Sequence, residues 1–195
     1  MNFSQPVVLE NRRVRLRPLE TSDFEALKTA AFDPDIWQYT LTRADDAVSL
    51  ADYLATAVHD REAGRRYAFA IVDRATGQLV GSTSYYNLVP ADQRLSIGHT
   101  WLGRAFQGTG LNRAANHLLL SYAFDHLGYE RVELETDSRN EQSQQAMRRM
   151  GATEEGTLRR HRLTQGGVRR DTVIFSIIRP EWDELRQTVF REYYA

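Results

Sequence analysis

The sequence predicts a mixed α/β fold, in which a central, partly antiparallel sheet of about seven strands is flanked by helices. Two short turns with glycine, at Ala75–Gly77 and Gly166–Gly167, each separate two strand-like segments and therefore predict antiparallel hairpins. A strand, a long helix over about residues 109–127 and a further strand follow one another, which predicts a parallel pair near the centre. This order differs from the regular strand–helix alternation of a dinucleotide-binding fold.

The first half of the chain is expected to begin with a strand and two helices. Apolar and basic residues alternate over Val14–Arg17, as in a half-exposed strand. Ser22 and Glu25 have the spacing of a capping box for a short helix that Pro34 ends or interrupts. The second helix is expected over about residues 45–62, with Val48, Ala51, Leu54, Ala55 and Val58 facing inward. The strands that follow are expected at Tyr67–Val72, Leu79–Tyr86 and Arg94–Leu102.

The second half begins with the helix over residues 109–127. It is expected to end at Gly128, because glycine readily adopts the left-handed conformation that closes a helix. The remaining elements are expected as a strand at Arg131–Thr136, a helix at Asn140–Met150 that stops at Gly151, two strands around Gly166–Gly167 and a last helix opened by Pro180.

Length and composition indicate one globular domain over residues 1–195. Apolar residues make up 42% of the chain and charged residues 26%. The formal net charge is only -1, so no overall field would draw the chain to nucleic acid or to a membrane. No apolar run approaches the ~20 residues that span a bilayer. We expect a cytoplasmic protein, present as a monomer or a homodimer.

Metal and thiol chemistry are not expected. The chain has no cysteine, which excludes disulfides, thiolate metal sites and a cysteine nucleophile. The histidines His59, His117, His126 and His161 show no metal-ligand spacing with one another, so no metal is predicted. His99 lies on a predicted strand and is interpreted as a packed side chain.

A glycine loop at Gly108–Gly110 follows a predicted strand and opens a predicted helix. Backbone amides at such a helix start can bind an anion near the positive end of the helix dipole. A dinucleotide fingerprint would require a third glycine where Arg113 stands, and a P-loop would require Gly-Lys-Ser/Thr in place of Leu111–Arg113. A nucleotide-binding module is therefore disfavoured, whereas a plain turn stays possible for a loop this short.

The surroundings of the loop resemble a known family. Gln107-x-x-Gly110-x-Asn112 is similar to the Q/R-x-x-G-x-G/A motif of the GCN5-related N-acetyltransferase superfamily. The upstream stretch Ile97–Leu102 (IGHTWL) and the downstream segment Asn140–Gly151 resemble two further segments of that superfamily, in the same order. The resemblance covers nearly the whole chain and is closest to the branch of ribosomal-protein N-terminal acetyltransferases.

The resemblance implies acetyl-CoA as cosubstrate and assigns residues to it. Residues Gln107, Gly108, Thr109, Gly110, Leu111 and Asn112 would wrap its pyrophosphate, mostly through backbone amides. Thr100, Trp101 and Leu102 would lie where two strands separate, and their amides would bond the pantetheine arm and polarise the thioester carbonyl. Asn140 would contact the pantetheine from across the cleft, with Ser143 nearby.

Three positions depart from the family pattern. Asn112 replaces a small glycine or alanine, so it would either hold the phosphate further out or add a donor. Ser96 stands where some members have a glutamate base, and Met147 stands where others have a tyrosine acid. The route of the protons is therefore the open question, and an acyl-CoA-binding regulatory module that has lost catalysis is the alternative to an enzyme.

Two side chains are candidates for proton transfer. Ser143 is the first candidate to donate to the leaving thiolate, although a serine there could simply cap its helix. Glu135 is a candidate base, acting directly or through water. Glu135 also shares one strand face with Glu133 and Asp137, and a solvated acidic row would need no function.

The acceptor is expected to be a primary amine, either a small molecule or a protein N-terminus. Trp37 and Tyr39 join the first two helices and would line the acceptor site or anchor the loop. The arginines of the late hairpin, Arg159, Arg160, Arg162, Arg169 and Arg170, are interpreted as a solvated edge or as an attraction for an acidic acceptor or for the 3′-phosphate of CoA. The sequence thus predicts an N-acetyltransferase that transfers the acetyl group directly.

Overall fold

One mixed sheet organises the protein, and the computed structural model describes residues 5–194. The sheet has eight strands in the order β1-β2-β3-β4-β5-β6-β8-β7. The strands are β1 (Leu9–Glu10), β2 (Val14–Pro18), β3 (Arg66–Asp73), β4 (Leu79–Val89), β5 (Arg94–Leu102), β6 (Arg131–Asp137), β7 (Thr153–Leu163) and β8 (Arg169–Ile178). The strand beyond the predicted set is β1, which is two residues long and too short to show a period in the sequence.

The pairing of the strands confirms the predicted mixture of directions. Within residues 5–194 only β5 and β6 pair in parallel, and the chain between them forms helix α3. The two predicted hairpins are present as the antiparallel pairs β3–β4 and β7–β8. Gly77 and Gly167 take left-handed φ values of 73° and 75° in the turns.

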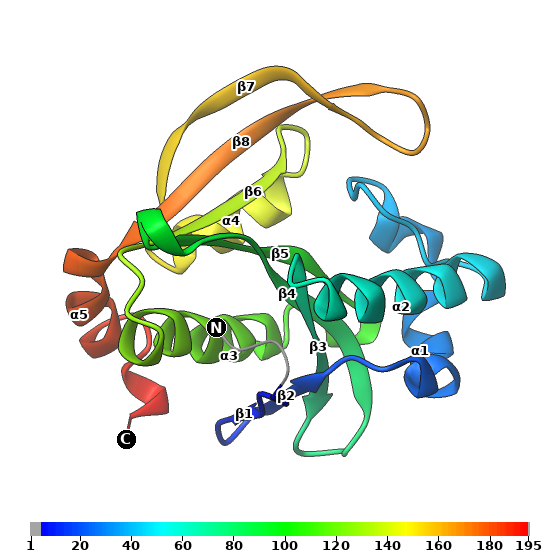
Figure 1. Ribbon diagram of the computed structural model, residues 1–195, viewed down its shortest axis with the longest axis horizontal. Coiled ribbons are helices and arrows are strands. Elements are labelled where there is room, and N and C mark those ends of the chain that lie inside the picture. Colours follow the sequence, from blue (N-terminus) through cyan, green and yellow to red (C-terminus); the bar gives the residue numbers. More distant parts are fainter. Residues whose placement is uncertain (1–4, 195) are drawn as a thin grey trace.

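Helices cover both faces of the sheet (Figure 1). They are α1 (Phe24–Ala31), α2 (Ala47–Glu62), α3 (Leu111–Ser121), α4 (Glu141–Arg149) and α5 (Arg179–Gln187). A core cluster under α3 to α5 includes Phe124, Met147 and Trp182, and a second cluster under α1 and α2 includes Trp37 and Trp101. Figure 1 shows α3 and α5 on one side of the sheet and α1 and α2 on the other, while the β7–β8 hairpin arches towards the segment between α1 and α2.

Two local predictions in the first half were wrong. A 3-10 turn over Thr21–Asp23 precedes α1, and its capping box consists of Glu20 and Asp23, not of Ser22 and Glu25; Asp23 accepts from the Glu20 N–H at 2.9 Å. Asp23 is also held by both terminal nitrogens of Arg17, at 2.7 and 2.8 Å. Helix α1 itself has Asp23 as its N-cap residue without a side-chain cap bond, one residue later than a cap at Ser22 would place it.

The buried face of α2 also differs from the prediction. Leu50, Tyr53, Leu54 and Ala57 are buried, whereas Val48 is 73% exposed and Ala51 and Ala55 are exposed. The helix is rotated because the ring of Tyr53 packs against Trp37 and Trp101 while its hydroxyl donates to Ser82 Oγ at 3.1 Å. An aromatic side chain with a polar tip can occupy a core position if the tip finds a partner.

The predicted ends of the later helices are largely confirmed. Helix α3 starts at Leu111 and continues as a π-helical turn over Tyr122–His126, so the helical segment stops before Gly128, whose φ is 70°. Gly151 follows α4 with a φ of 85°, and a Cβ there would lie 2.3 Å from Leu185. In residues 5–194, no helix combines the length and the apolar character that crossing a membrane would require.

Candidate active site

The glycine loop presents a row of unbonded backbone amides. Gly110 is the residue that caps α3, with a φ of 90°, and Gly108 has a φ of 72°. In the described part of the chain, the N–H groups from Gly108 to Arg113 have no hydrogen-bond partner. Gly108, Thr109 and Gly110 are exposed, and no side chain caps the helix. This row at the positive end of an 11-residue helix is suited to a phosphate group.

Side chains on both sides hold the loop in this shape. Gln107 Nε2 donates to the carbonyl of Leu102 at 3.1 Å, which ties the loop to the end of β5. Arg13, from the turn between β1 and β2, donates to the carbonyl of Thr109 at 2.8 Å. A Cβ on Gly110 would lie 3.6 Å from the Arg13 guanidinium. The sequence did not point to Arg13, because this residue lies almost a hundred positions before Thr109, in a turn without a recognisable motif.

The structure shows how the side chain of Asn112, which replaces the glycine or alanine of the family motif, is oriented. Its Oδ1 accepts from Asn116 Nδ2 at 3.0 Å, one helical turn further along α3. The oxygen of the side-chain amide is therefore turned along the helix, and its NH2 group has no partner within residues 5–194. Of the two options for Asn112, this geometry supports an added donor.

Strands β5 and β6 separate next to the loop. Their last parallel pair is Ile97–Leu134, so the edge of β5 from Gly98 to Leu102 has no β6 partner in the described chain. A bulge at the point of separation gives His99 a φ of 49° and places Thr83 of β4 opposite two residues of β5. The three predicted pantetheine-binding residues all lie beyond this point.

The side chains of these three residues face the protein. Thr100 Oγ1 lies 2.8 Å from Thr83 Oγ1. The indole of Trp101 packs against Trp37, with ring centroids 5.0 Å apart, and Leu102 belongs to the first core cluster. The resemblance assigns the backbone amides of these residues, not their side chains, to the cosubstrate, and that assignment stays a prediction.

Helix α4 begins across from the loop and brings Asn140 and Ser143 to it. Asn140 Oδ1 accepts from the Ser143 N–H at 3.0 Å and thus caps the helix. Ser143 itself is not the cap, and its half-buried hydroxyl has no partner among residues 5–194. Gln142 Nε2 lies 3.5 Å from Gln107 Oε1 and links the start of α4 to the loop.

The acidic row on β6 is paired, which corrects the expectation of a solvated face. Asp137 is fully buried and is bonded by Arg139 at 2.6 and 2.9 Å. Glu133 accepts from Arg131 at 2.9 Å. Glu135 is 15% exposed, and its Oε1 lies 3.4 Å from Arg170 and 3.6 Å from Arg162.

A tyrosine that the sequence did not single out covers the point of separation. The ring of Tyr86 lies over Gly98, since a Cβ on that glycine would be 2.7 Å from the ring. Tyr86 is 8% exposed, and burial raises the pKa of its hydroxyl well above the usual value, so it stays protonated. Ser96 beside it is 2% exposed and lies 3.5 Å from Glu133 Oε2. Met147 packs in the first core cluster.

The two aromatic candidates of the acceptor wall occupy different places. Trp37 is 3% exposed and donates from its indole nitrogen to the carbonyl of Ala31 at 2.8 Å. Of the two predicted roles, its burial favours that of an anchor for the loop over that of an acceptor wall. Tyr39 is half-buried between the guanidinium of Arg139, 5.9 Å from its ring, and Arg170, which donates to its carbonyl at 3.4 Å.

His99 is packed, as expected. Its ring meets that of Tyr86 edge-on at 5.1 Å, and its Nδ1 lies 3.3 Å from Arg66. Burial, followed by the positive charges of Arg66 and Arg162, lowers the pKa of His99 to about 4, so the ring is neutral at pH 7. Across residues 5–194 no group of three or more His, Asp or Glu side chains could hold a metal ion.

Comparisons with known proteins agree with this geometry. Residues 13–153 match the family model described as "Acetyltransferase (GNAT) domain". The Bacillus subtilis protein named "Putative ribosomal N-acetyltransferase YdaF" is 35% identical over 107 residues, which cover 55% of this chain and 57% of that protein. A second B. subtilis protein, the uncharacterized N-acetyltransferase YoaA, is 27% identical over 89% of this chain and 97% of its own length.

Solved structures show the same likeness. The crystal structure of a GCN5-related N-acetyltransferase from Brucella melitensis superposes with a TM-score of 0.88 at 28% identity. The superposition covers 96% of this chain and 85% of that one. The mixed sheet flanked by helices is thus a fold shared with a solved acetyltransferase.

Proposed function

Since this chain belongs to the GNAT family of acetyltransferases, we propose that it moves an acetyl group from acetyl-CoA directly to a primary amine, with a peptide or protein α-amine as the favoured acceptor. The observation that carries the proposal is the row of free amides from Gly108 to Arg113, next to the point where β5 and β6 separate. A phosphate-binding helix start and an unpaired strand edge together match a cosubstrate with a phosphate end and an acyl end. A cytoplasmic location belongs to the same proposal.

The residues present fit acetyl-CoA. The exposed loop would bind the pyrophosphate, and the positive charge of Arg13 beside Thr109 adds to the attraction. The free edge of Thr100–Leu102 would bond the pantetheine arm and orient the thioester carbonyl. Asn140 and Ser143 would meet the arm from the other side, because α4 starts next to the loop.

The chemistry proposed is a direct displacement. The neutral amine attacks the thioester carbon, the carbonyl oxygen takes up negative charge near the β5 amides, and the carbon–sulfur bond then breaks. The Ser143 hydroxyl stabilises the departing sulfur with a hydrogen bond. The proton that the nitrogen loses passes through water to Glu135 Oε2 and from there, again through water, to the thiolate, so that Ser143 and Glu135 end in their starting states. The products are the N-acetylated amine and CoA with a free thiol.

An α-amine needs less help from the protein than a lysine side chain. An α-amino group with a pKa of about 8 is roughly 10% neutral at pH 7, whereas a lysine with a pKa of about 10.4 is well under 0.1% neutral. Glu135, the first β6 residue after the last parallel pair of β5 and β6, already contacts two arginines. A site with this arrangement favours amines that lose their proton readily.

The proposal is tested with peptides that differ in where the amine is. Acetyl-CoA is mixed with the protein and with peptides that carry a free N-terminus, a blocked N-terminus plus lysine, or neither. We expect CoA release and a single acetyl group on the free N-terminal nitrogen. Calorimetry with acetyl-CoA alone separates the two parts of the proposal, since tight binding without transfer to any amine would leave only the cosubstrate site.

A further inference from the structure

The face of the sheet next to the strand separation has more arginines than carboxylates. Arg162 and Arg170 contact the same oxygen of Glu135, at 3.6 and 3.4 Å. The side chain of Arg170 is 4% exposed and that of Arg162 is 37% exposed. One carboxylate therefore serves two guanidinium groups, one of which is almost withdrawn from water, and the trio keeps a positive charge.

A third guanidinium, that of Arg66, shares its carboxylate with another arginine and keeps unsatisfied N–H donors. The side chain of Arg66 is 6% exposed, and its nearest carboxylate, Asp60, lies 3.5 Å from Nε. Arg65 donates to the other oxygen of Asp60, Oδ1, at 2.8 and 3.0 Å, so one carboxylate again serves two guanidinium groups. Within residues 5–194, Nε and one terminal nitrogen of Arg66 are buried without a hydrogen bond. Buried N–H donors without a hydrogen bond are costly, so an anion that bonds to them on binding would be stabilised.

His99 connects the two groups of arginines. Arg66 lies 3.3 Å from its Nδ1, and both Arg66 and Arg162 are close enough for their charge to lower its pKa further after burial has done so. The neutral ring adds no charge of its own at pH 7. The neighbouring carboxylates are paired, Asp137 with Arg139 and Glu133 with Arg131.

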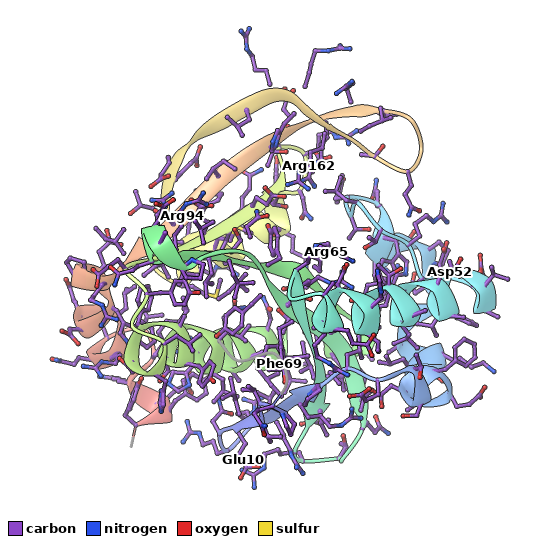
Figure 2. All side chains as sticks on the ribbon, in the orientation of Figure 1. Glu10, Asp52, Arg65, Phe69, Arg94 and Arg162 are labelled. Atoms are coloured by element: carbon purple, nitrogen blue, oxygen red, sulfur yellow. The ribbon has the colours of Figure 1, made fainter. Side chains whose placement is uncertain are left out.

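A bulge in β7 aims Arg162 at this face. The registered pairs Leu158–Thr172 and Arg162–Arg170 leave two extra residues on β7. Arg160 within the bulge has a φ of 50°, and its N–H donates to Asp171 at 2.6 Å. Arg162 thus lies beneath the arch of the β7–β8 hairpin (Figure 2). Arg159 and Arg160 of the edge strand β7 and Arg169 of β8 are exposed. The hairpin arginines are therefore two sets, and only the inner set faces the sheet.

We propose that the acceptor amine carries a carboxylate close to its reacting nitrogen, and that Arg162, with Arg66 and Arg170 adding positive charge, binds this carboxylate. The inference rests on the proposed transfer to an amine and names the class of acceptor. The carboxylate belongs either to an acidic side chain among the first residues of a peptide or to the α-carboxylate of a free amino acid. Both sources present the same chemistry to the arginines.

The test compares acceptors that differ by one charge. Two peptides both begin with a free N-terminal alanine; the second residue is glutamate in one and glutamine in the other. Free glutamate and free alanine are assayed beside them. We expect kcat/KM to favour the glutamate peptide by about tenfold, and salt to reduce the ratio, since the attraction is electrostatic. Faster acetylation of the free amino acids than of the peptides would assign the carboxylate to the α position.

Two variants on the same hairpin separate this attraction from a general effect of charge. Arg162→Gln should reduce the glutamate-to-glutamine ratio to less than about threefold, whereas Arg159→Gln, on the outer edge, should leave it as in the unchanged protein. Equal rates for the two peptides together with no faster acetylation of the free amino acids, or the same loss of preference in both variants, would overturn the inference while transfer itself stands. Acetyl-CoA binding without acetylation of any amine would overturn the inference together with the proposed function.

Discussion

Replacing Gly110 by aspartate would place a negative charge where the structure offers only N–H donors. Gly110 caps α3, and the amides around it are unbonded in the described chain. The new side chain has room, because the nearest atom to its Cβ is a nitrogen of Arg13 at 3.6 Å. The left-handed φ of 90° costs about 1–2 kcal/mol, and attraction to Arg13 and to the helix start offsets part of it. The variant is therefore expected to fold.

The effect on acetyl-CoA binding should be large. Two unit charges 4 Å apart repel by about 4 kcal/mol at an effective dielectric constant of 20, and salt screens part of this. An aspartate that pairs with Arg13 also removes that guanidinium from the phosphate. We expect the Kd of acetyl-CoA to rise by between about 100-fold and about 1000-fold.

Calorimetric Kd values for acetyl-CoA, measured with two control variants, separate the effect of the aspartate charge from that of the side chain's size and backbone strain. Gly110→Asn brings nearly the same size and the same backbone strain without a charge, and it should weaken binding by less than about tenfold. Gly128→Asp adds a charge at a glycine with a φ of 70° beyond the other end of the α3 segment, and it should leave the Kd unchanged. Equal Kd values for the aspartate and asparagine variants at position 110, both folded, would show that the phosphates bind elsewhere.

Three further predictions concern the proton, the acceptor and stability. Ser143→Ala should lower kcat about tenfold or more with little change in the acceptor KM, and an unchanged kcat would leave Ser143 no role beyond its place in the helix. Between pH 6 and 8, kcat/KM for peptide α-amines should rise as the amine loses its proton; faster acetylation of N-terminally blocked lysine peptides would require a base such as Glu135. Burial lowers the pKa of His117 to about 4 in the folded protein, whereas an unfolded histidine has a pKa of about 6.5. Between these pH values only the unfolded chain binds a proton at His117, so the melting temperature should fall as the pH falls from 6.5 to 4. His117→Phe should weaken this pH dependence, and an identical pH dependence in that variant would contradict the assignment.

Much of the sheet follows from local signals in the sequence. The turns at Gly77 and Gly167 determine two hairpins because each glycine takes a φ that other residues rarely adopt. The glycine loop was visible for the same reason, since Gly108 and Gly110 both have positive φ. Where the backbone itself demands glycine, the sequence shows the position directly.

The arginine-rich face beside the strand separation, where we propose that the acceptor binds, was far less visible in the sequence, because its shape depends on contacts between distant strands. His99 and Arg160 take positive φ values in bulges although neither is a glycine, so no residue type marks the bulges. The burial of Arg170 and Arg66 arises from β8 and β3 lying on opposite sides of the strand separation. The rotation of α2 likewise depends on a hydroxyl of Tyr53 reaching Ser82 across the sheet. The pattern of apolar and polar residues along one strand or helix predicts neither the bulges, nor the buried arginines, nor the rotation of α2.

The central claim is that acetyl-CoA gives its acetyl group to an α-amine at the strand separation beside the Gly108–Gly110 loop. Mass spectrometry of a lysine-containing peptide with a free N-terminus, after incubation with the protein and acetyl-CoA, tests it most directly. We expect one acetyl group, located on the N-terminal nitrogen by fragmentation and absent when Gly110→Asp replaces the unchanged protein. An acetyl group found only on lysine, or an equal yield with the Gly110→Asp protein, would contradict it.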